Sequence, residues 1–308
     1  MSDVKKYVVA VSGGLDSIVL LDVLKNNRLS ELTHFQLPTS NFQLIVAHFD
    51  HGIRKDSSTD EDFARGVAGE YGLTYLSQRA ELGEDASEEQ ARTMRYNFLR
   101  QCCKTHNAQL ITAHHQDDLI ETIIINLIRG TGWRGLVSLN SDEFVIRPFL
   151  STPKPALLSY AQEHHLTWRE DSTNSNQNYL RNYVRLTLLP KMYEADPDSK
   201  NKLLQINMQI TEAKKEIATE LQNLNIKYQI SNIKYDVPRH DLIMWPPLVA
   251  KEVIYNCLVQ LDSNWHPNSD SINRVLHFCK SAINGKSYEV SGSLRIEVNK
   301  GVVQFKKV

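Results

Sequence analysis

The residues best suited to chemistry in this chain form the segment Ser12-Gly13-Gly14-Leu15-Asp16-Ser17. The segment follows Tyr7–Val11, a short apolar run typical of a buried strand, and precedes Ile18–Leu24, whose apolar spacing suits a helix. Two glycines allow a tight turn close to a ligand, and the free N–H groups and positive dipole end of the helix then form an anion site. The hydroxyls of Ser12 and Ser17 add donors. Asp16 suits this place if a cation such as Mg²⁺ lies between its carboxylate and a phosphate.

This segment differs from two common phosphate-binding motifs. No GKS or GKT follows it, as in a Walker loop, and it contains no GxGxxG dinucleotide fingerprint. An ordinary glycine turn with a capping Ser or Asp would explain a bare Gly-Gly, but it explains the full strand, SGGxDS and helix context less well. The pattern resembles the pyrophosphate loop (PP-loop) of the N-type ATP pyrophosphatases. Those enzymes transfer AMP to a substrate oxygen and release pyrophosphate.

A second polar segment, His114-His115-Gln116-Asp117-Asp118, follows a predicted strand and opens a predicted helix that carries Glu121. Acids at a helix start interact favourably with its dipole, so capping alone explains one of them. Two adjacent acids with Glu121 one turn on exceed what a cap requires, and they concentrate negative charge where a cationic group or Mg²⁺ could bind. The histidines have no third partner at metal-ligand spacing, so nucleotide contacts or capping explain them better than a metal site.

Further polar residues are candidates for ligand contacts. His48 ends the second predicted strand, where polar residues often serve function, although a satisfied structural histidine is common there. Arg92 and Arg95 share one face of a predicted helix and could hold phosphates or form a solvated surface. Arg129 and Arg134 belong to a glycine-rich turn suited to backbone or base contacts.

The segments Arg169–Asn174 and Tyr179–Arg185 are rich in amide side chains, arginine and tyrosine. This composition can read and stack exposed bases. A loop followed by a charged helix face has the same composition. Composition alone therefore leaves both interpretations open.

Strand-like and helix-like segments alternate through the first half of the chain. Strands are predicted at 7–11, 44–48, 74–76, 108–113 and 144–146, with helices at 59–71, 88–105 and 117–129 between them. The alternation predicts an α/β fold with a parallel five-stranded sheet and helices on both faces. Ligands of such folds bind beyond the carboxyl ends of the strands, so residues 12–17, 48–54 and 113–118 should converge.

The alternation weakens in the second half. A long amphipathic helix is predicted at 201–224, followed by helices near 249–261 and 269–283 and a final hairpin. The hairpin is predicted from strands at 290–295 and 302–305 with a turn at 299–301. We therefore expect a nucleotide-binding catalytic domain at 1–192, a linker and connecting helix at 193–224, and a small α+β domain at 225–308.

Composition sets wider bounds. The chain has 308 residues, 41% of them hydrophobic and 23% charged, which suits a soluble protein of two domains. Its net charge of −1 gives no global sign of nucleic-acid binding, although a local basic patch is compatible with it. The four cysteines form no CxxC pair, which favours reduced thiols in the cytoplasm. We expect neither a signal peptide nor a membrane-spanning helix.

Taken together, the polar segments resemble those of the tRNA(Ile)-lysidine synthetases. The matching stretches are SGGLDS from Ser12, AHFDHGIR from Ala47, EEQARTMRYNFL from Glu88, TAHHQDDLIETIIINLIRGTGWRGL from Thr112, RPFL from Arg147 and EDSTNSNQNYLRNYVRLTLLP from Glu170. The resemblance is close from Tyr7 to Pro190 and loose afterwards. The HHxDDxxET element together with EDxxN…RNxxR distinguishes this family from other PP-loop enzymes.

The resemblance implies that ATP, with Mg²⁺ near Asp16, adenylates the 2-carbonyl oxygen of the wobble cytidine in an isoleucine tRNA with a CAU anticodon. The ε-amine of free L-lysine then displaces AMP and gives lysidine. The implied nucleotide contacts are Ser12–Ser17, His48 and His114, and the implied catalytic residues are Asp16, Asp117, Arg92 and Arg95. Lysine would be bound by Asp117, Asp118 and Glu121. The tRNA would be bound by the small C-terminal domain and by Arg129, Arg134, Asn174, Arg181, Asn182 and Arg185. An oligomer is possible.

Three alternatives remain. A PP-loop tRNA cytidine thiolase usually carries CxxC pairs, whereas Cys102 and Cys103 are adjacent on a predicted helix and suit core packing. An amidating ligase of the NAD-synthetase type would not need the arginine–asparagine segment. A nucleotide-sensing or RNA-binding module without turnover is disfavoured by the intact Asp16 and the Asp117–Asp118 pair.

Overall fold

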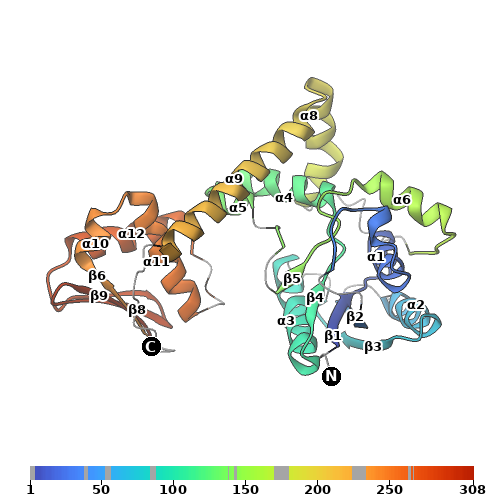
Figure 1. Ribbon diagram of the computed structural model, residues 1–308, viewed down its shortest axis with the longest axis horizontal. Helices are drawn as coiled ribbons and strands as arrows, with labels where there is room; N and C mark the ends of the chain where they lie inside the picture. The colour runs from blue at the N-terminus through green and yellow to red at the C-terminus, as the bar shows by residue number, and fades with distance from the viewer. Residues whose placement is uncertain are drawn as a thin grey trace. The chain divides into compact units, whose positions relative to one another are not determined.

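The computed structural model describes residues 4–37, 41–52, 57–83, 88–137, 139–141, 144–169, 180–223, 234–262, 265 and 267–308 (Figure 1). Its internal packing divides the chain into two compact units. The first unit comprises residues 1–125 and 138–200, and the second comprises residues 126–137 and 201–308. The predicted domains at 1–192, 193–224 and 225–308 stay a prediction.

The first unit is built on a parallel sheet. Its strands are β1 (Lys5–Ala10), β2 (Phe42–Asp50), β3 (Thr74–Arg79), β4 (Gln109–Ile111) and β5 (Val145–Ile146). Its helices are α1 (Leu15–Lys25), α2 (Ser57–Glu70), α3 (Glu88–His106), α4 (Gln116–Ile128, ending in the second unit), α6 (Lys154–Glu163), α7 (Leu180–Tyr183) and α8 (Leu189–Ala195), with the helical turns η1 (Leu29–Glu31) and η3 (Val184–Leu188). The strand order is β3-β2-β1-β4-β5 and every pairing is parallel, which confirms the predicted sheet.

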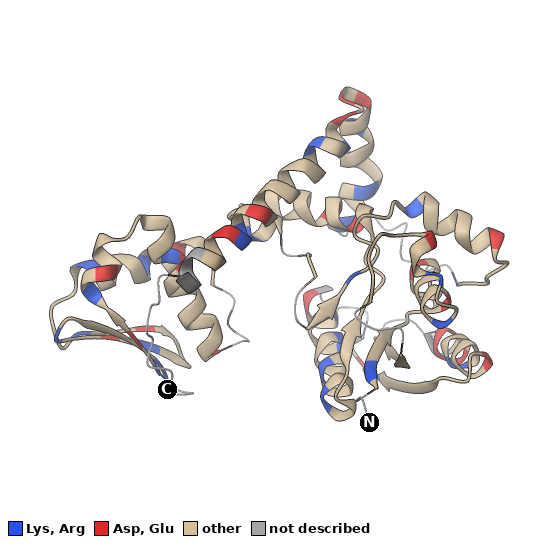
Figure 2. Ribbon diagram, viewed as in Figure 1, with Lys and Arg blue, Asp and Glu red and all other residues tan. Residues whose placement is uncertain are grey.

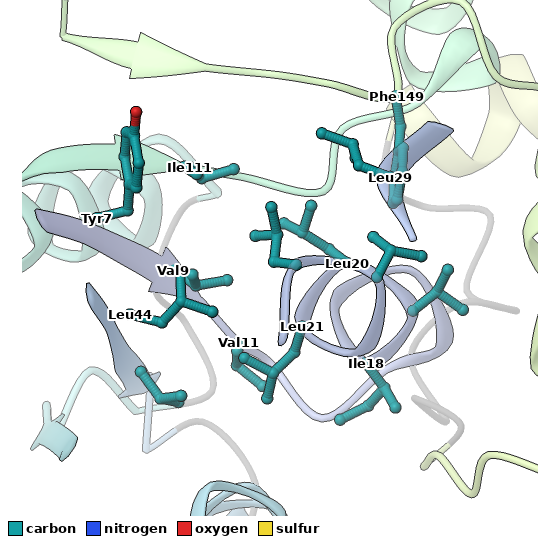
Figure 3. Packing of buried hydrophobic residues seen from close by; sticks show 14 of the residues in the cluster. Tyr7, Val9, Val11, Ile18, Leu20, Leu21, Leu29, Leu44, Ile111 and Phe149 are labelled. Carbon is teal, nitrogen blue, oxygen red and sulfur yellow. The ribbon is translucent and has the colours of Figure 1, made fainter. Parts of the chain in front are cut away.

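Helices cover both faces of this sheet because successive strand residues point to opposite sides. On one face Tyr7 and Val9 of β1 pack in a buried cluster with residues of α1, α2 and α6, among them Leu20 and Leu21 (Figure 3). On the other face Val8 packs with Ile45, Leu110 and residues of α3. Strands buried on both sides must be apolar throughout, which explains the continuous apolar runs in the sequence.

The register brings the polar segments to one edge of the sheet. Val9 pairs with Ile111, Ala10 with Ala47, and Ile111 with Ile146. The segments that follow β1, β2, β4 and β5 therefore leave the sheet at neighbouring positions, as predicted for its carboxyl ends. Of the predicted segment 48–54, residues 53 and 54 lie outside the described residues.

The second unit contains an antiparallel sheet packed against helices. Its strands are β6 (Lys234–Pro238), β7 (Ser287–Ser291), β8 (Leu294–Asn299) and β9 (Val302–Lys307), in the order β6-β9-β8-β7. Its helices are α5 (Trp133–Leu136), α9 (Ser199–Asn223, beginning in the first unit), α10 (Arg239–Met244), α11 (Pro247–Leu261) and α12 (Ser269–Ser281). Phe305, Ile296 and Cys257 are buried in its core. The predicted α+β character is confirmed. None of the helices described here is long and apolar enough to cross a bilayer.

The final hairpin corrects one sequence prediction. The predicted strand 290–295 is wrong, because Gly292 and Ser293 form the turn between β7 and β8. Small polar residues disrupt the apolar pattern there, and the pairing shifts register between Glu289 and Ser291. The predicted turn at 299–301 is confirmed. Lys300 and Gly301 both have positive φ, of 43° and 83°, as a two-residue hairpin turn of type I′ requires.

Candidate active site

The glycine loop between β1 and α1 is held in shape by its own serines. Ser17 Oγ accepts the Ser12 N–H at 3.2 Å and donates to the Gly14 carbonyl at 2.9 Å. Gly13 has a φ of +92°, which favours glycine, whereas Gly14 has an ordinary φ of −75°. Gly14 caps α1 without a side-chain hydrogen bond, so the first N–H groups of this helix keep their capacity to bind an anion.

Asp16 lies in the first turn of α1 and faces His115. Its Oδ2 is 3.6 Å from His115 Nε2, and its buried Oδ1 has no hydrogen-bond partner among the described residues. Burial opposes ionisation of Asp16, but the nearby N–H and charge of His115 outweigh burial and hold the pKa of Asp16 below its usual range. The carboxylate is therefore charged at neutral pH.

His115 joins the glycine loop to the acids of α4. The ring is 2% exposed, and its Nδ1 accepts the backbone N–H groups of Asp117 at 3.2 Å and Asp118 at 3.4 Å. The proton of the neutral ring is therefore on Nε2, which faces Asp16 and lies 3.5 Å from Asp118 Oδ2. Burial alone would lower the pKa of His115, but the carboxylates of Asp16 and Asp118 raise it above its usual value.

The three predicted acids have different partners. Asp117 Oδ1 lies 2.9 Å from Lys200 Nζ, and its Oδ2 accepts the Lys154 N–H at 2.9 Å. Although burial opposes ionisation, these contacts lower the pKa of Asp117. Asp118 Oδ2 accepts the His115 N–H at 3.0 Å, so the third residue of α4 reaches back to the residue before the helix, as in a capping box.

Glu121 is 2% exposed and forms a bidentate pair with Arg185, at 2.6 and 3.0 Å. Burial raises its pKa, and the guanidinium of Arg185 partly offsets this effect. Arg185 lies in η3, a π-helical turn in which the Leu189 N–H reaches back five residues to the Val184 carbonyl. Such a turn re-aims side chains and is frequent at functional sites.

Comparison with known proteins places this geometry in a family. A model of the PP-loop domain matches residues 2–192. The chain belongs to the PP-loop family. Its relatives include the tRNA(Ile)-lysidine synthases of Thermotoga maritima, 36% identical over 199 residues, and Bacteroides thetaiotaomicron, 35% identical over 209 residues. These alignments cover 62% and 65% of this chain but 46% of each relative, so the chain spans about half the length of the relatives it matches.

A solved structure shares the PP-loop fold. The U34-tRNA thiolase NcsA from Methanococcus maripaludis, determined with its [4Fe-4S] cluster, superposes with a TM-score of 0.54 at 21% sequence identity. The match covers 68% of this chain and 73% of that protein. At this identity the likeness concerns the fold alone.

Among the predicted nucleotide contacts of the PP-loop unit, the two histidines are largely enclosed. His48 is 3% exposed, and its Nδ1 donates to the Val11 carbonyl at 2.8 Å, tying the end of β2 to the end of β1. His114 Nδ1 lies 2.8 Å from Thr112 Oγ1. Burial, together with neighbouring arginines, lowers the pKa of His114 to about 3, so this ring is neutral.

The side chains predicted to contact tRNA differ in how exposed they are and in whether they already have partners. Arg181 and Arg185 are 28% and 31% exposed beside Glu121, whereas Asn182 is 8% exposed and turned into the protein. Asn174 lies outside the described residues. In the second unit Arg129 is exposed, while the guanidinium of Arg134 pairs with Glu252 and lies 4.3 Å from the ring centre of Tyr255.

Sequence reasoning missed two members of this PP-loop site. The sequence prediction named His114 as a nucleotide contact and not His115, because nothing in the adjacent pair indicates which ring faces Asp16 and Asp118. Lys200 was missed because it lies 83 positions from Asp117 in a polar helix start, where lysine is ordinary. Only the packing of the start of α9 against α4 in the first unit reveals this contact.

Proposed function

We propose that this PP-loop protein ligates L-lysine to C2 of the wobble cytidine of tRNA(Ile) with a CAU anticodon, giving lysidine, AMP and pyrophosphate. The observation that carries the proposal is the His115 contact with both Asp16 and Asp118. It joins a phosphate loop to an acid cluster, as a reaction between a nucleotide and a cationic amine requires. The sequence similarity to tRNA(Ile)-lysidine synthases supports the choice of substrate.

In the activation step the cytidine O2 attacks the α-phosphorus of ATP, and the bond to pyrophosphate breaks. The N-terminus of α1 and the guanidinium groups of Arg92 and Arg95 would stabilise the phosphate charges. Asp16 Oδ1 is a buried acceptor with no partner among the described residues, so it fits a Mg²⁺ that is bound chiefly by the triphosphate. Such an ion would offset the charge of the departing pyrophosphate.

In the second step the lysine ε-amine attacks C2, and the C–O bond to AMP breaks with AMP taking the electron pair. The ammonium group must first lose a proton, for which Asp117, Asp118 and Glu121 are candidate acceptors. Asp117 is suited to bind an ammonium ligand, because its carboxylate already binds the ammonium group of Lys200. Adenylation makes this attack feasible, since AMP is a far better leaving group than the carbonyl oxygen.

The tRNA would contact the exposed Arg129, the partly exposed Arg181 and Arg185, the small C-terminal domain and the segment around Asn174. Asn182 and Arg134 are engaged within the protein, so we expect them to position neighbouring residues. The reaction is expected in the cytoplasm, where tRNA, ATP and free lysine meet. A thiolase activity is disfavoured because the side chains of Cys102 and Cys103, both on α3, are buried in the core, where burial raises their pKa values.

The test combines the full chain, Mg-ATP, labelled lysine and tRNA with a CAU anticodon. We expect label in the RNA and release of AMP and pyrophosphate. Asp16→Asn should abolish pyrophosphate release and leave tRNA binding largely intact, while Asp62→Asn, at an exposed position of α2, should behave as wild type. Label that enters RNA only with a sulfur donor, or pyrophosphate release without RNA, would overturn the proposal.

A further inference from the structure

A group of arginines lies on the side of the sheet that α3 covers. Arg92, Arg95 and Tyr96 are on α3, and the Tyr96 ring packs against the buried cluster that contains Leu110 of β4 and Val145 of β5. Arg147 follows β5, two residues after Val145, and strand alternation directs it to the same side. We call Arg92, Arg95 and Arg147 the arginine cluster.

Arg92 is exposed and Arg95 and Tyr96 are half-buried, but one polar atom each of Arg95, Tyr96 and Arg147 is buried without a hydrogen-bond partner among the described residues. Arg147 is 6% exposed; its Nη1 donates to the Asn140 carbonyl at 2.7 Å, and its Nε has no partner among the described residues. The same holds for Arg95 Nε and for the hydroxyl of Tyr96. Buried donors without partners are rare in native proteins and costly, because their desolvation is not compensated.

The region also carries uncompensated positive charge. The guanidinium carbons of Arg92 and Arg95 lie 4.9 and 5.5 Å from the centre of the Tyr96 ring. Within the described part of the chain, none of the three arginines has a carboxylate oxygen within 4.0 Å, and α3 carries several basic positions (Figure 2). The nearby Asp118 is engaged by His115 and approached by Arg185.

The electrostatic effects agree with this geometry. Burial would raise the pKa of Tyr96, but Arg92, Arg95 and Arg147 together lower it below its usual value. Like charges brought together in a partly desolvated place repel one another unless an anion joins them.

We propose that the arginine cluster and the Tyr96 hydroxyl bind a phosphate group, which makes Arg147 and Tyr96 phosphate ligands in addition to Arg92 and Arg95. The site lies on the α3 side of the sheet, whereas the glycine loop leads into α1 on the other side. The phosphate has two possible sources, the α-phosphate of the nucleotide or a phosphodiester of the RNA strand. The identification of the nucleotide and the RNA as the two sources rests on the proposed function, whereas the phosphate site itself does not.

The test compares Arg147→Met, Arg147→Lys and Tyr96→Phe with wild type. Arg100→Met is the matched control, because Arg100 is an exposed arginine on the same helix whose guanidinium stacks on Phe144. ATP binding is measured by calorimetry, and binding of a CAU anticodon stem-loop is measured between 50 and 200 mM salt.

If the nucleotide supplies the phosphate, Arg147→Met should weaken ATP binding by about 10-fold or more and leave the RNA salt dependence unchanged. If the RNA supplies it, the slope of log K against log salt should fall by about 1 and ATP binding should stay constant. Arg147→Lys should retain part of the lost affinity, because it keeps the charge. The proposal would be overturned if the ATP and RNA affinities of Arg147→Met were both within twofold of those of the Arg100→Met control.

Tyr96→Phe separates binding from folding. Among the described residues the hydroxyl forms no hydrogen bond, although the guanidinium of Arg147 lies nearby and acts on it, so its removal should leave the melting temperature unchanged or slightly raised, while affinity for the phosphate ligand falls about 3- to 10-fold. A lower melting temperature with unchanged affinity would show a structural role instead. Both measurements need no turnover, so a loss of phosphate binding is distinguishable from a failure of the lysine-transfer assay.

Discussion

The ammonium group of Lys200 lies 2.9 Å from Oδ1 of Asp117, and both side chains are 28% exposed. A substrate lysine that uses Asp117 must displace this group or share the carboxylate with it. A partly exposed pair of this kind contributes about 0.2–1 kcal/mol, so it can be displaced by a ligand of ordinary affinity. With lysine bound at Asp117 as proposed above, Lys200 would act as an internal competitor for the substrate.

Lys200→Met tests this competition. We expect the concentration of lysine needed for half-maximal transfer to fall about 2- to 5-fold, because the carboxylate is then free, while ATP affinity stays constant. Lys191→Met, at an exposed position of α8, is the control. An increased lysine requirement would show that Lys200 orients Asp117 and does not compete with lysine.

His114 provides a pH-dependent prediction. The folded pKa of about 3 lies below the usual value near 6.5, so between these limits the unfolded chain binds a proton that the native chain does not. Stability should therefore fall as pH decreases through this window, by no more than about 1.4 kcal/mol per pH unit from this group. His114→Gln should flatten the fall in urea unfolding experiments at pH 7.5 and 5.0, and His34→Gln, at an exposed position, should not.

At the scale of elements, the two glycines of the loop are needed for different reasons: Gly13 for its backbone conformation and Gly14 for close approach to a ligand. Gly13 needs its positive φ of +92°, whereas an alanine Cβ at Gly14 would meet Ser12 Oγ at 3.5 Å, an ordinary contact. We expect Gly13→Ala to destabilise the first unit by about 1–2 kcal/mol and Gly14→Ala by less than about 0.5 kcal/mol.

Both glycine variants should weaken ATP binding, because each adds a methyl group where the backbone must approach phosphate. Urea unfolding and calorimetric ATP titration of the same samples separate the two effects. An ATP affinity of Gly14→Ala equal to that of wild type would show that the ligand does not approach this part of the loop.

The parallel sheet was predictable because buried strands leave continuous apolar runs between helices of ordinary length. The convergence of Asp16 with Asp117 and Asp118 followed from the rule that such strands end at one edge. The role of His115 could not be predicted, because it depends on which of two adjacent rings points toward α1. The β7–β8 turn was missed because its small residues interrupt an otherwise strand-like run only briefly.

At the scale of the molecule, the two units have separate apolar cores. Phe305 is fully buried in the core of the second unit, with Ile296 and Val298 in the same cluster. Phe305→Ala should destabilise that unit by about 3–5 kcal/mol, the usual cost of a large cavity, and leave ATP binding by the first unit near its wild-type value.

Tryptophan fluorescence suits this measurement, because Trp133, Trp245 and Trp265 belong to the second unit and Trp168 to the first. Ile283→Ala, at a position 75% exposed, is the control and should leave the fluorescence transition in place. A loss of ATP binding in parallel with the fluorescence change would mean that the units unfold as one.

All four cysteines are buried free thiols, Cys102 and Cys103 in the first unit and Cys257 and Cys279 in the second. A chromogenic disulfide reagent can therefore reach sulfur only when a core opens. The modification rate of the two cysteines in each unit, followed by peptide mass, therefore reports how often the core of that unit opens. No added label is needed.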